Sequence, residues 1–205
     1  MLRLPPLYAI VDPLDTGADP IELAVALLAG GARLLQLRLK EATSAELLRA
    51  AAAIRPRARA AGALFLVNDR PDIARAVDAD GVHLGQDDLS VAAARRVLGS
   101  GRLVGVSTHD LEQARAGEAA GADYLAVGPV YATTSKAGAP SPRGLELVHA
   151  VRLAVSLPLV AIGGITAETA VAARAAGADA VAMIGALVRT RDVEAAVRGV
   201  LARLA

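Results

Sequence analysis

Rare polar residues follow short apolar runs in this chain, and their types suit the binding of anions. The sequence has only two lysines, Lys40 and Lys136, against twenty arginines. The one asparagine, Asn68, and two of the three glutamines, Gln36 and Gln86, occupy similar positions. Residues that follow the strands of a repeating strand–helix chain face one common mouth, so we expect these side chains to converge there. A chance grouping of loop residues is the alternative, and the motifs below argue against it.

Residues 36–40 alternate polar and apolar side chains. Alternation places Gln36, Arg38 and Lys40 on one side of a strand and Leu37 and Leu39 on the other. The Gln36 amide can read the donor and acceptor edge of a heterocycle. The two cations can bind a polyphosphate, one as a planar fork and one as a point charge. An exposed basic strand end with surface ion pairs is the alternative.

Two carboxylates follow neighbouring runs, Asp69 after the third and Asp88 after the fourth. Such a pair can hold Mg²⁺ and leave coordination positions for phosphate oxygens and water. Asp69 could instead cap the helix that begins at Pro71, and Asp88 or Ser90 could cap the next helix. His83 is expected to be a hydrogen-bonded structural residue rather than a ligand.

A long irregular segment, residues 128–142, follows the sixth run. Loops of this length are commonly functional, and this one combines hydroxyls with a lysine, as an anion clamp requires. The clamp residues are Thr133, Thr134, Ser135 and Lys136. Ser107, which follows the fifth run, is placed to donate a hydrogen bond to a ligand.

Glycines follow the last two runs, at Gly163, Gly164 and Gly185. Glycine lets backbone N–H groups approach an oxyanion closely, and this is the usual phosphate site of strand–helix barrels. The sequence therefore predicts two anion sites, one basic and one built from backbone groups. A protein that joins two phosphorylated molecules needs both.

The elements that must position these residues recur at nearly even spacing. Short continuous apolar runs are typical of parallel strands buried on both faces, and the segments between them are long enough for helices. The runs are Leu7–Val11, Leu34–Leu37, Leu64–Val67, Gly81–Leu84, Leu103–Val106, Tyr124–Val127, Leu159–Ile162 and Ala180–Ile184. The helical segments include Ile21–Ala29, Ser44–Ala61, Pro71–Val77, Leu111–Ala120, Ala167–Ala176 and Val193–Leu204, with start signals at Thr43 or Ser44, Asp110 and Thr166.

Eight strand–helix units predict one α/β domain over residues 1–205, a (β/α)₈ TIM barrel. An open doubly wound sheet is the alternative, but no G-x-G-x-x-G follows the first run. Related turns at 31–33, 79–81, 121–123 and 177–179 precede strands. In these turns a glycine is expected to end the helix in a left-handed cap and an aspartate to open the strand. They belong to the pole opposite the mouth, so we interpret them as structural.

Composition excludes several classes of function. Hydrophobic residues make up 54% of the 205 residues, and the net charge is +1. This charge is too small to indicate a surface that binds nucleic acid or an anionic membrane. Cysteine is absent, so disulfides and thiolate chemistry are excluded. We expect a cytoplasmic protein, because neither a signal peptide nor a membrane span is evident. Alanine-rich helices could pack against a second copy, so a homodimer is one candidate state.

Six motifs, taken in order, resemble the thiamine phosphate synthase family. They are Gln-x-Arg-x-Lys (36–40), Val-Asn-Asp-Arg (67–70), Gly-Val-His-Leu-Gly-Gln-Asp-Asp (81–88), Gly-Val-Ser-Thr-His (105–109), Gly-Pro-Val-Tyr…Thr-x-Ser-Lys (128–136) and Ile-Gly-Gly-Ile (162–165). The resemblance implies a transferase that condenses 4-amino-5-hydroxymethyl-2-methylpyrimidine diphosphate with a thiazole phosphate. Thiamine phosphate and diphosphate would be the products, with CO₂ if the thiazole is carboxylated.

The resemblance also assigns roles to residues. It implies that Asp69 and Asp88 hold Mg²⁺, and that the catalytic residues are Arg38, Lys40, Ser107 and Lys136. It implies a pyrimidine diphosphate site of Gln36, Leu37, Arg38, Leu39, Lys40, Asn68, Ser107 and Lys136. It implies a thiazole phosphate site of Thr133, Thr134, Ser135, Gly164, Ile184 and Gly185.

The chain departs from the family at a few positions. Gly185 stands where a serine is common, Leu39 where an acid is common, and Ser135 where a threonine is common. TenI-like thiazole tautomerases are the nearest alternative, but they carry a catalytic histidine at the position of Pro129 and often lose the metal carboxylates. Two further readings are a non-catalytic thiazole- or thiamine-phosphate-binding regulator and a phosphosugar isomerase that uses one of the two lysines.

Overall fold

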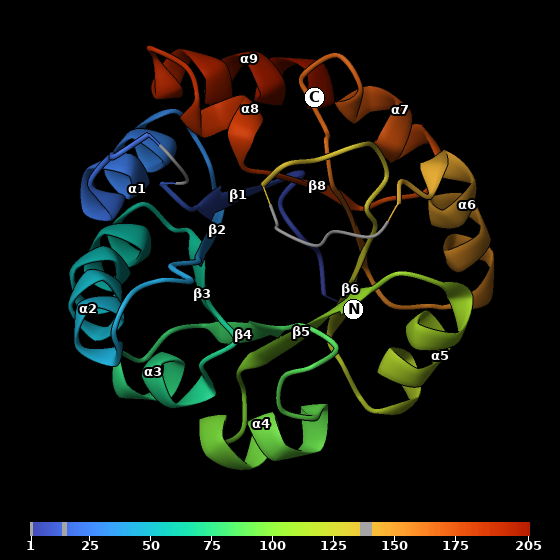
Figure 1. The fold of residues 1–205 in the computed structure, drawn as a ribbon, viewed down its shortest axis with the longest axis horizontal. Coiled ribbons are helices and arrows are strands. Elements are labelled where there is room, and N and C mark those ends of the chain that lie inside the picture. Colours follow the sequence, from blue (N-terminus) through green and yellow to red (C-terminus); the bar gives the residue numbers. More distant parts are fainter. Residues whose placement is uncertain (1, 14–15, 136–140) are drawn as a thin grey trace.

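A computed structural model describes residues 2–13, 16–135 and 141–205. Eight parallel strands close into one barrel in chain order, and helices surround it (Figure 1), so the predicted (β/α)₈ fold is confirmed. The strands are β1 Leu7–Val11, β2 Leu34–Leu37, β3 Leu64–Asn68, β4 Gly81–Leu84, β5 Leu103–Thr108, β6 Tyr124–Val127, β7 Leu159–Ile162 and β8 Ala180–Met183. The helices are α1 Pro20–Ala29, α2 Ser44–Ala60, α3 Pro71–Ala76, α4 Val91–Leu98, α5 Leu111–Ala119, α6 Gly144–Ala154, α7 Ala170–Ala175, α8 Gly185–Val188 and α9 Val193–Leu204.

Helix starts follow the predicted capping signals with one exception. Thr43 forms a capping box with Glu46 before α2, and the Asp110 side chain accepts from Gln113 N before α5. Thr166 is not the cap of α7, because its own backbone N–H donates to Thr169 Oγ1 at 2.9 Å. The preceding turn therefore continues three residues further, and α7 begins at Ala170.

Two apolar layers hold the barrel together. Alternation along each strand sends one set of side chains into the barrel and the other set toward the helices. The interior set is small and includes two of the three tyrosines: Tyr8, Ile10, Leu34, Leu66, Tyr124, Ala126, Val160, Ala180 and Ala182. The larger outer layer, which includes Leu37, Phe65 and Val67, fills the space between strands and helices.

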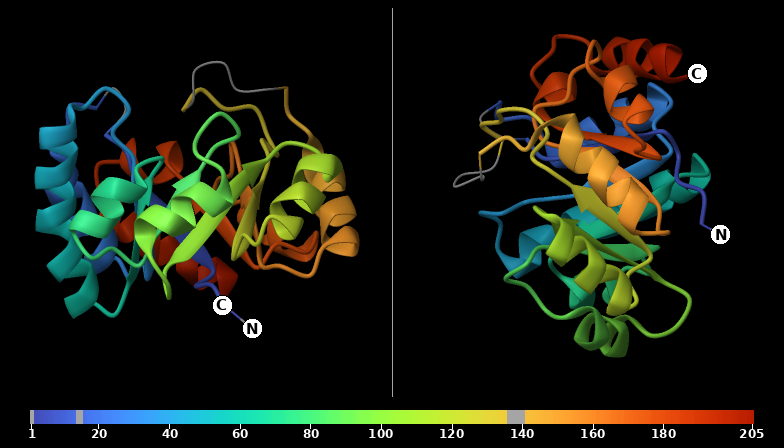
Figure 2. Two further views of the ribbon diagram at one scale, coloured as in Figure 1. Left: turned by 90° about the horizontal axis from the view of Figure 1, so that it is seen from below. Right: turned by 90° about the vertical axis from the view of Figure 1, so that its right-hand side faces the viewer.

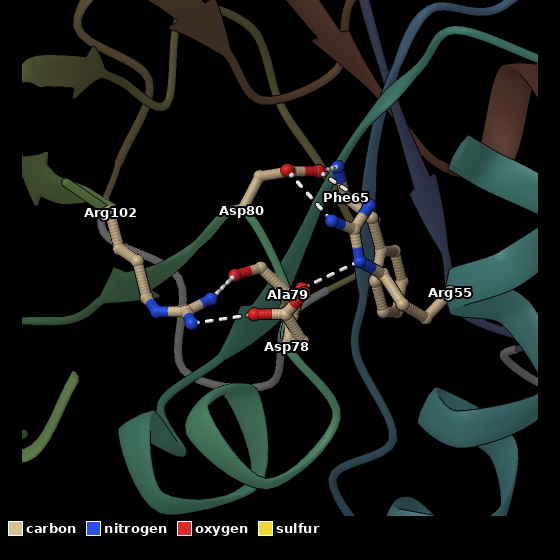
Figure 3. Close-up of polar contacts among 6 residues, drawn as sticks. All are labelled: Arg55, Phe65, Asp78, Ala79, Asp80 and Arg102. Carbon is tan, nitrogen blue, oxygen red and sulfur yellow. Dashed lines mark hydrogen bonds and ion pairs between the residues drawn. The ribbon is translucent and has the colours of Figure 1, made fainter. Parts of the chain in front are cut away.

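The pole at the amino ends of the strands is closed by a repeated arginine–aspartate clamp (Figure 3). Asp80 accepts from Arg55 Nη1 and Nη2, both at 3.1 Å, and from the backbone N–H of Phe65 at 2.8 Å. Arg102 contacts the same turn, where it donates to Asp78 and to the carbonyl of Ala79. The clamp recurs with Asp123 between Arg95 and Val104 N, and with Asp179 between Arg152 and Leu159 N. Each aspartate thus joins the start of its own strand to the start of the strand before it.

The predicted left-handed glycine caps are correct in three of the four turns. Gly31, Gly121 and Gly177 have positive φ, but in the turn at 79–81 the left-handed residue is Asp78, with φ of 58°. Gly81 is required for another reason, because a Cβ there would lie 2.2 Å from the Leu103 carbonyl oxygen.

The two ends of the described chain lie at this clamped pole, and residues 128–135, which follow β6, lie at the opposite end (Figure 2). The carboxyl ends of the strands therefore form an open mouth whose loops differ in length. Within the described parts of the chain, no helix is both long enough and apolar enough to cross a membrane.

Candidate active site

An ion pair between Arg38 and Asp12 occupies the mouth above β1 and β2. The side chains are only 14% and 10% exposed. The backbone N–H of Arg38 also donates to Val11 O at 3.0 Å, which fixes the start of the segment that carries the guanidinium. Sequence reasoning predicted Arg38 and missed Asp12, although Asp12 directly follows β1 and the rule that found the other residues applies to it.

The two predicted metal carboxylates lie next to each other. Asp69 pairs with Lys40 and lies within hydrogen-bonding reach of Asp88. Burial, together with the neighbouring carboxyl of Asp69, raises the pKa of Asp88, and Lys40 opposes this shift. The cluster thus gathers one cation and two acids after β2, β3 and β4.

Neither acid caps a helix: the capping alternative is wrong for Asp69, and of the two candidates for the next helix, Asp88 and Ser90, the cap is Ser90. The cap residue of α3 is Arg70, without a side-chain cap bond, and Asp69 has φ of 60°. Asp88 accepts from the backbone N–H of Gly85 at 2.7 Å, whereas Ser90 is the cap of α4. Aspartate adopts the left-handed region more readily than most residues, and Asp78 does the same in the turn before β4.

A chain of hydrogen bonds crosses the barrel interior beneath the mouth. Gln36 Nε2 donates to the Tyr8 hydroxyl at 2.8 Å, and the hydroxyls of Tyr8 and Tyr124 lie 2.9 Å apart. Tyr124 Oη lies 2.9 Å from His83 Nδ1, and His83 Nε2 lies 2.9 Å from Ser107 Oγ. His83 is therefore a hydrogen-bonded interior residue, as predicted, and it connects two predicted substrate-binding residues, Gln36 and Ser107.

Tyr8 and Tyr124, the two tyrosines of this buried hydrogen-bond network, remain protonated. Burial raises the pKa of Tyr8 and the pKa of Tyr124 well above their ordinary value. The ring of Tyr124 also stacks on His83, with centroids 5.6 Å apart. Gly105 makes room for that ring, because a Cβ there would lie 2.0 Å from Tyr124 Cζ.

A cavity of about 330 Å³ opens between the ends of β5, β6, β7 and β8. All six residues predicted for the thiazole phosphate lie in its wall: Thr133, Thr134, Ser135, Gly164, Ile184 and Gly185. Ser107 lies in the same wall, next to the buried hydrogen-bond chain. Arg189 is also part of the wall, and sequence reasoning missed it because it follows an unpredicted short helix, α8.

The glycines after β7 are required by the packing of the protein itself. Gly163 and Gly164 have φ of 99° and 63°. A Cβ on Gly163 would lie 2.5 Å from Pro129 Cβ, and one on Gly164 would lie 2.3 Å from Ala132 O. The close approach of the segment after β6 thus demands glycine at both positions, whether or not a ligand is bound.

The remaining predicted residues divide into three groups. Asn68 is the last residue of β3. Alternation along the strand turns its side chain toward the barrel interior, and it pairs with His83 of β4. Leu37 is fully buried in the outer layer and Leu39 packs against that layer, so their side chains face the helices. Lys136 lies outside the described residues.

Comparisons with known proteins converge on one family. A family model described as thiamine monophosphate synthase matches residues 7–187. Thiamine-phosphate synthase from Moorella thermoacetica is 49% identical over 193 residues, covering 94% of this chain and 92% of that protein. The one from Methanoculleus marisnigri is 48% identical over 200 residues, covering 97% and 95%. The solved thiamine phosphate pyrophosphorylase from Pyrococcus furiosus superposes with a TM-score of 0.89 at 35% identity, covering 97% of this chain and 95% of that one.

Proposed function

The chain belongs to the thiamine monophosphate synthase family, and from that membership we propose that residues 1–205 form one catalytic domain that makes thiamine phosphate. Its substrates are the pyrimidine diphosphate and the thiazole phosphate expected from the sequence. The observation that carries this proposal is that two groups of residues suited to anions lie at one mouth: the cations and acids above β1 to β4, and the hydroxyl-lined cavity. Ser107 lies in the cavity wall and contacts His83 of the buried hydrogen-bond network.

The pyrimidine diphosphate is assigned to the region above β1 to β4. Gln36 and Asn68, on the interior faces of β2 and β3, are placed to read the ring. Arg38 and Lys40 supply positive charge for the diphosphate, and their present partners, Asp12 and Asp69, hold them at the mouth. Cations that are positioned in advance stabilise a charged leaving group without reorganising during the reaction.

The thiazole phosphate is assigned to the cavity between β5 and β8. Its wall offers the hydroxyls of Thr133, Thr134 and Ser135 for a phosphate, and apolar surface from Ile162 and Ile184 for the ring. Ser107, which lies between the two regions, is placed at the boundary where the substrates meet.

The reaction breaks the bond between the pyrimidine methylene carbon and the diphosphate oxygen, and the electron pair leaves with the diphosphate. The thiazole nitrogen then shares its lone pair with the methylene carbon, which forms the new C–N bond. No proton leaves the reacting atoms, which agrees with a site whose buried groups include two tyrosines that remain neutral. The protein contributes orientation, charge and exclusion of water.

Mg²⁺ is proposed to bind at Asp69 and Asp88. Two adjacent carboxylates, one with a raised pKa, suit a hard divalent cation that relieves their repulsion. When bound, the ion would neutralise charge on the departing diphosphate. Within the described chain no three metal-ligating side chains cluster, so phosphate oxygens and water would complete the coordination.

The tautomerase alternative is weaker. Pro129 forms part of the cavity wall, and proline carries no group that can transfer a proton. A regulator that binds only thiazole phosphate would need the cavity but not the cations and acids above β2 to β4.

The test combines the purified protein, Mg²⁺ and both substrates, with chromatographic detection of thiamine phosphate and diphosphate. A parallel assay follows isomerisation of the thiazole phosphate alone. Condensation without isomerisation is expected. Isomerisation without condensation would contradict the proposal, and binding of thiazole phosphate without either reaction would identify a regulator. Asp69→Asn should lower turnover about 10- to 100-fold and raise the Mg²⁺ concentration required.

A further inference from the structure

Arg189 lies in the wall of the cavity and is not among the residues that the sequence assigned to it. It directly follows α8, and its side chain forms part of the wall. Its Nη1 atom lies 3.5 Å from Thr134 Oγ1. A Cβ built on Gly185 would lie 3.5 Å from the same nitrogen and 3.6 Å from Ser135 Oγ. The Arg189 guanidinium and Ser135 Oγ therefore border the space where Gly185 has no side chain, and Thr134 lies beside the guanidinium.

This space is not imposed by the packing of the protein. Gly163 and Gly164 must be glycine, because they have positive φ and a side chain on either would collide with the segment after β6. At Gly185 the φ angle is not in the left-handed region, and an added Cβ would meet only ordinary contacts. The gap at Gly185 is therefore open toward the cavity, between Ser135 and Arg189.

We propose that Arg189 binds the phosphate monoester in this cavity and sets its preference for a phosphorylated thiazole. The inference rests on the proposed function and deepens it. One phosphate oxygen would occupy the gap at Gly185, where the guanidinium can donate two parallel hydrogen bonds while Thr134 and Ser135 donate from the other side. Arginine suits this task because its planar fork matches phosphate geometry and its charge persists at any working pH.

Charge supports this assignment. Among the described residues of the cavity wall, Arg189 is the one permanent cation. Arg38 and Lys40 lie above β1 to β3 and are not part of this wall, so they serve the other anion. The other polar groups that the described wall offers a dianionic phosphate are hydroxyls, backbone groups and the His109 imidazole.

The test compares Arg189→Ala and Arg189→Lys with the matched control Arg191→Ala, which removes an exposed arginine two residues away. Steady-state kinetics give the KM for each substrate, and titration calorimetry gives the affinity for the thiazole phosphate and for the thiazole alcohol that lacks phosphate. Loss of a charged hydrogen-bond donor should raise the KM for thiazole phosphate about 10- to 100-fold in the alanine variant, with a smaller rise in the lysine variant. The KM for pyrimidine diphosphate, and the affinity for the alcohol, should change less than about twofold.

The outcomes separate this inference from the proposed function. If the wild type makes no thiamine phosphate, the proposed function fails, and calorimetry with thiazole phosphate still tests Arg189 directly. If the wild type is active and Arg189→Ala leaves the thiazole phosphate KM and affinity unchanged, the inference is overturned while the function stands. Equal losses for both substrates, or for the phosphate and the alcohol alike, also overturn it. Unchanged melting of both alanine variants would show that the fold is retained.

Discussion

His83 Nε2 lies 2.9 Å from Ser107 Oγ, and the other hydrogen bonds of the buried network favour His83 as the donor. The Tyr8 hydroxyl accepts from Gln36, so its own proton points to Tyr124. Tyr124 in turn donates to His83 Nδ1, which places the imidazole proton on Nε2, facing Ser107. In this arrangement Ser107 accepts from His83 and keeps its own proton for another acceptor, such as an oxygen of the leaving diphosphate.

Ser107→Ala should lower kcat about 100-fold, because removal of one donor aimed at developing negative charge has an effect of about that size. Steady-state assays with both substrates would measure it. Ser90→Ala is the matched control, since Ser90 caps α4 through a bond from Ala93 N at 3.3 Å. The control should cost about 1 kcal/mol of stability and leave kcat unchanged. Equal kcat in the two variants would disprove the role assigned to Ser107.

Tyr124→Phe should destabilise the fold by about 1–3 kcal/mol, because the buried Tyr8 proton and His83 Nδ1 lose their partner. Denaturant unfolding gives the free energy. Tyr131→Phe is the control, because the Tyr131 hydroxyl does not belong to the buried hydrogen-bond network. This variant should change the free energy of unfolding by less than about 0.5 kcal/mol. A Tyr124→Phe protein as stable as the control would show that the hydrogen bonds contribute nothing net.

Asp88 should make stability depend on pH in the metal-free protein. Its pKa is raised in the folded chain, so the folded state holds this proton more tightly than the unfolded state does. The favourable contribution is complete below the ordinary pKa of an aspartate and is lost as the pH rises through the raised value. At neutral pH the charge at position 88 therefore opposes folding.

Asp88→Asn should accordingly raise the melting temperature at neutral pH in EDTA, while it lowers activity with Mg²⁺. The exposed neighbour Asp87 provides the control, and Asp87→Asn should change neither quantity. The gain in melting temperature of Asp88→Asn over the wild type should shrink toward pH 4, because the wild-type carboxyl becomes protonated and neutral there. A lower melting temperature at neutral pH would count against the raised pKa.

Asp12→Asn should cost about 3 kcal/mol, because it leaves the largely buried Arg38 guanidinium without its counter-charge. Asp72→Asn is the contrasting variant, since the Arg70–Asp72 pair has side chains 37% and 54% exposed and should contribute less than about 1 kcal/mol. Urea unfolding of the two variants at the same ionic strength makes the comparison. Similar losses of unfolding free energy in the two variants would mean that burial of the Arg38–Asp12 pair has no energetic consequence.

Local patterns in the sequence were sufficient for the architecture. The alternation of Gln36 and Leu37 predicted which side chain enters the barrel, because neighbouring side chains on a strand must face opposite ways. The capping box at Thr43 and the apolar runs act over a few residues, so their geometry is independent of the rest of the chain. The positions of Asp69, Asp88 and the hydroxyls after β6 followed from the same rule, since every strand of a parallel barrel ends at one mouth.

The tertiary structure alone decided which polar groups meet. Tyr8 and Tyr124 are 116 residues apart and share a hydrogen bond only because the closed barrel brings β1 and β6 across one interior. Asp12 meets Arg38 through the pairing of β1 with β2, and Gly164 must be glycine because of the Ala132 carbonyl on another loop. Periodicity and capping arise from covalent neighbours, whereas these contacts depend on how the strands are staggered when the sheet closes, and no short segment of sequence contains that information.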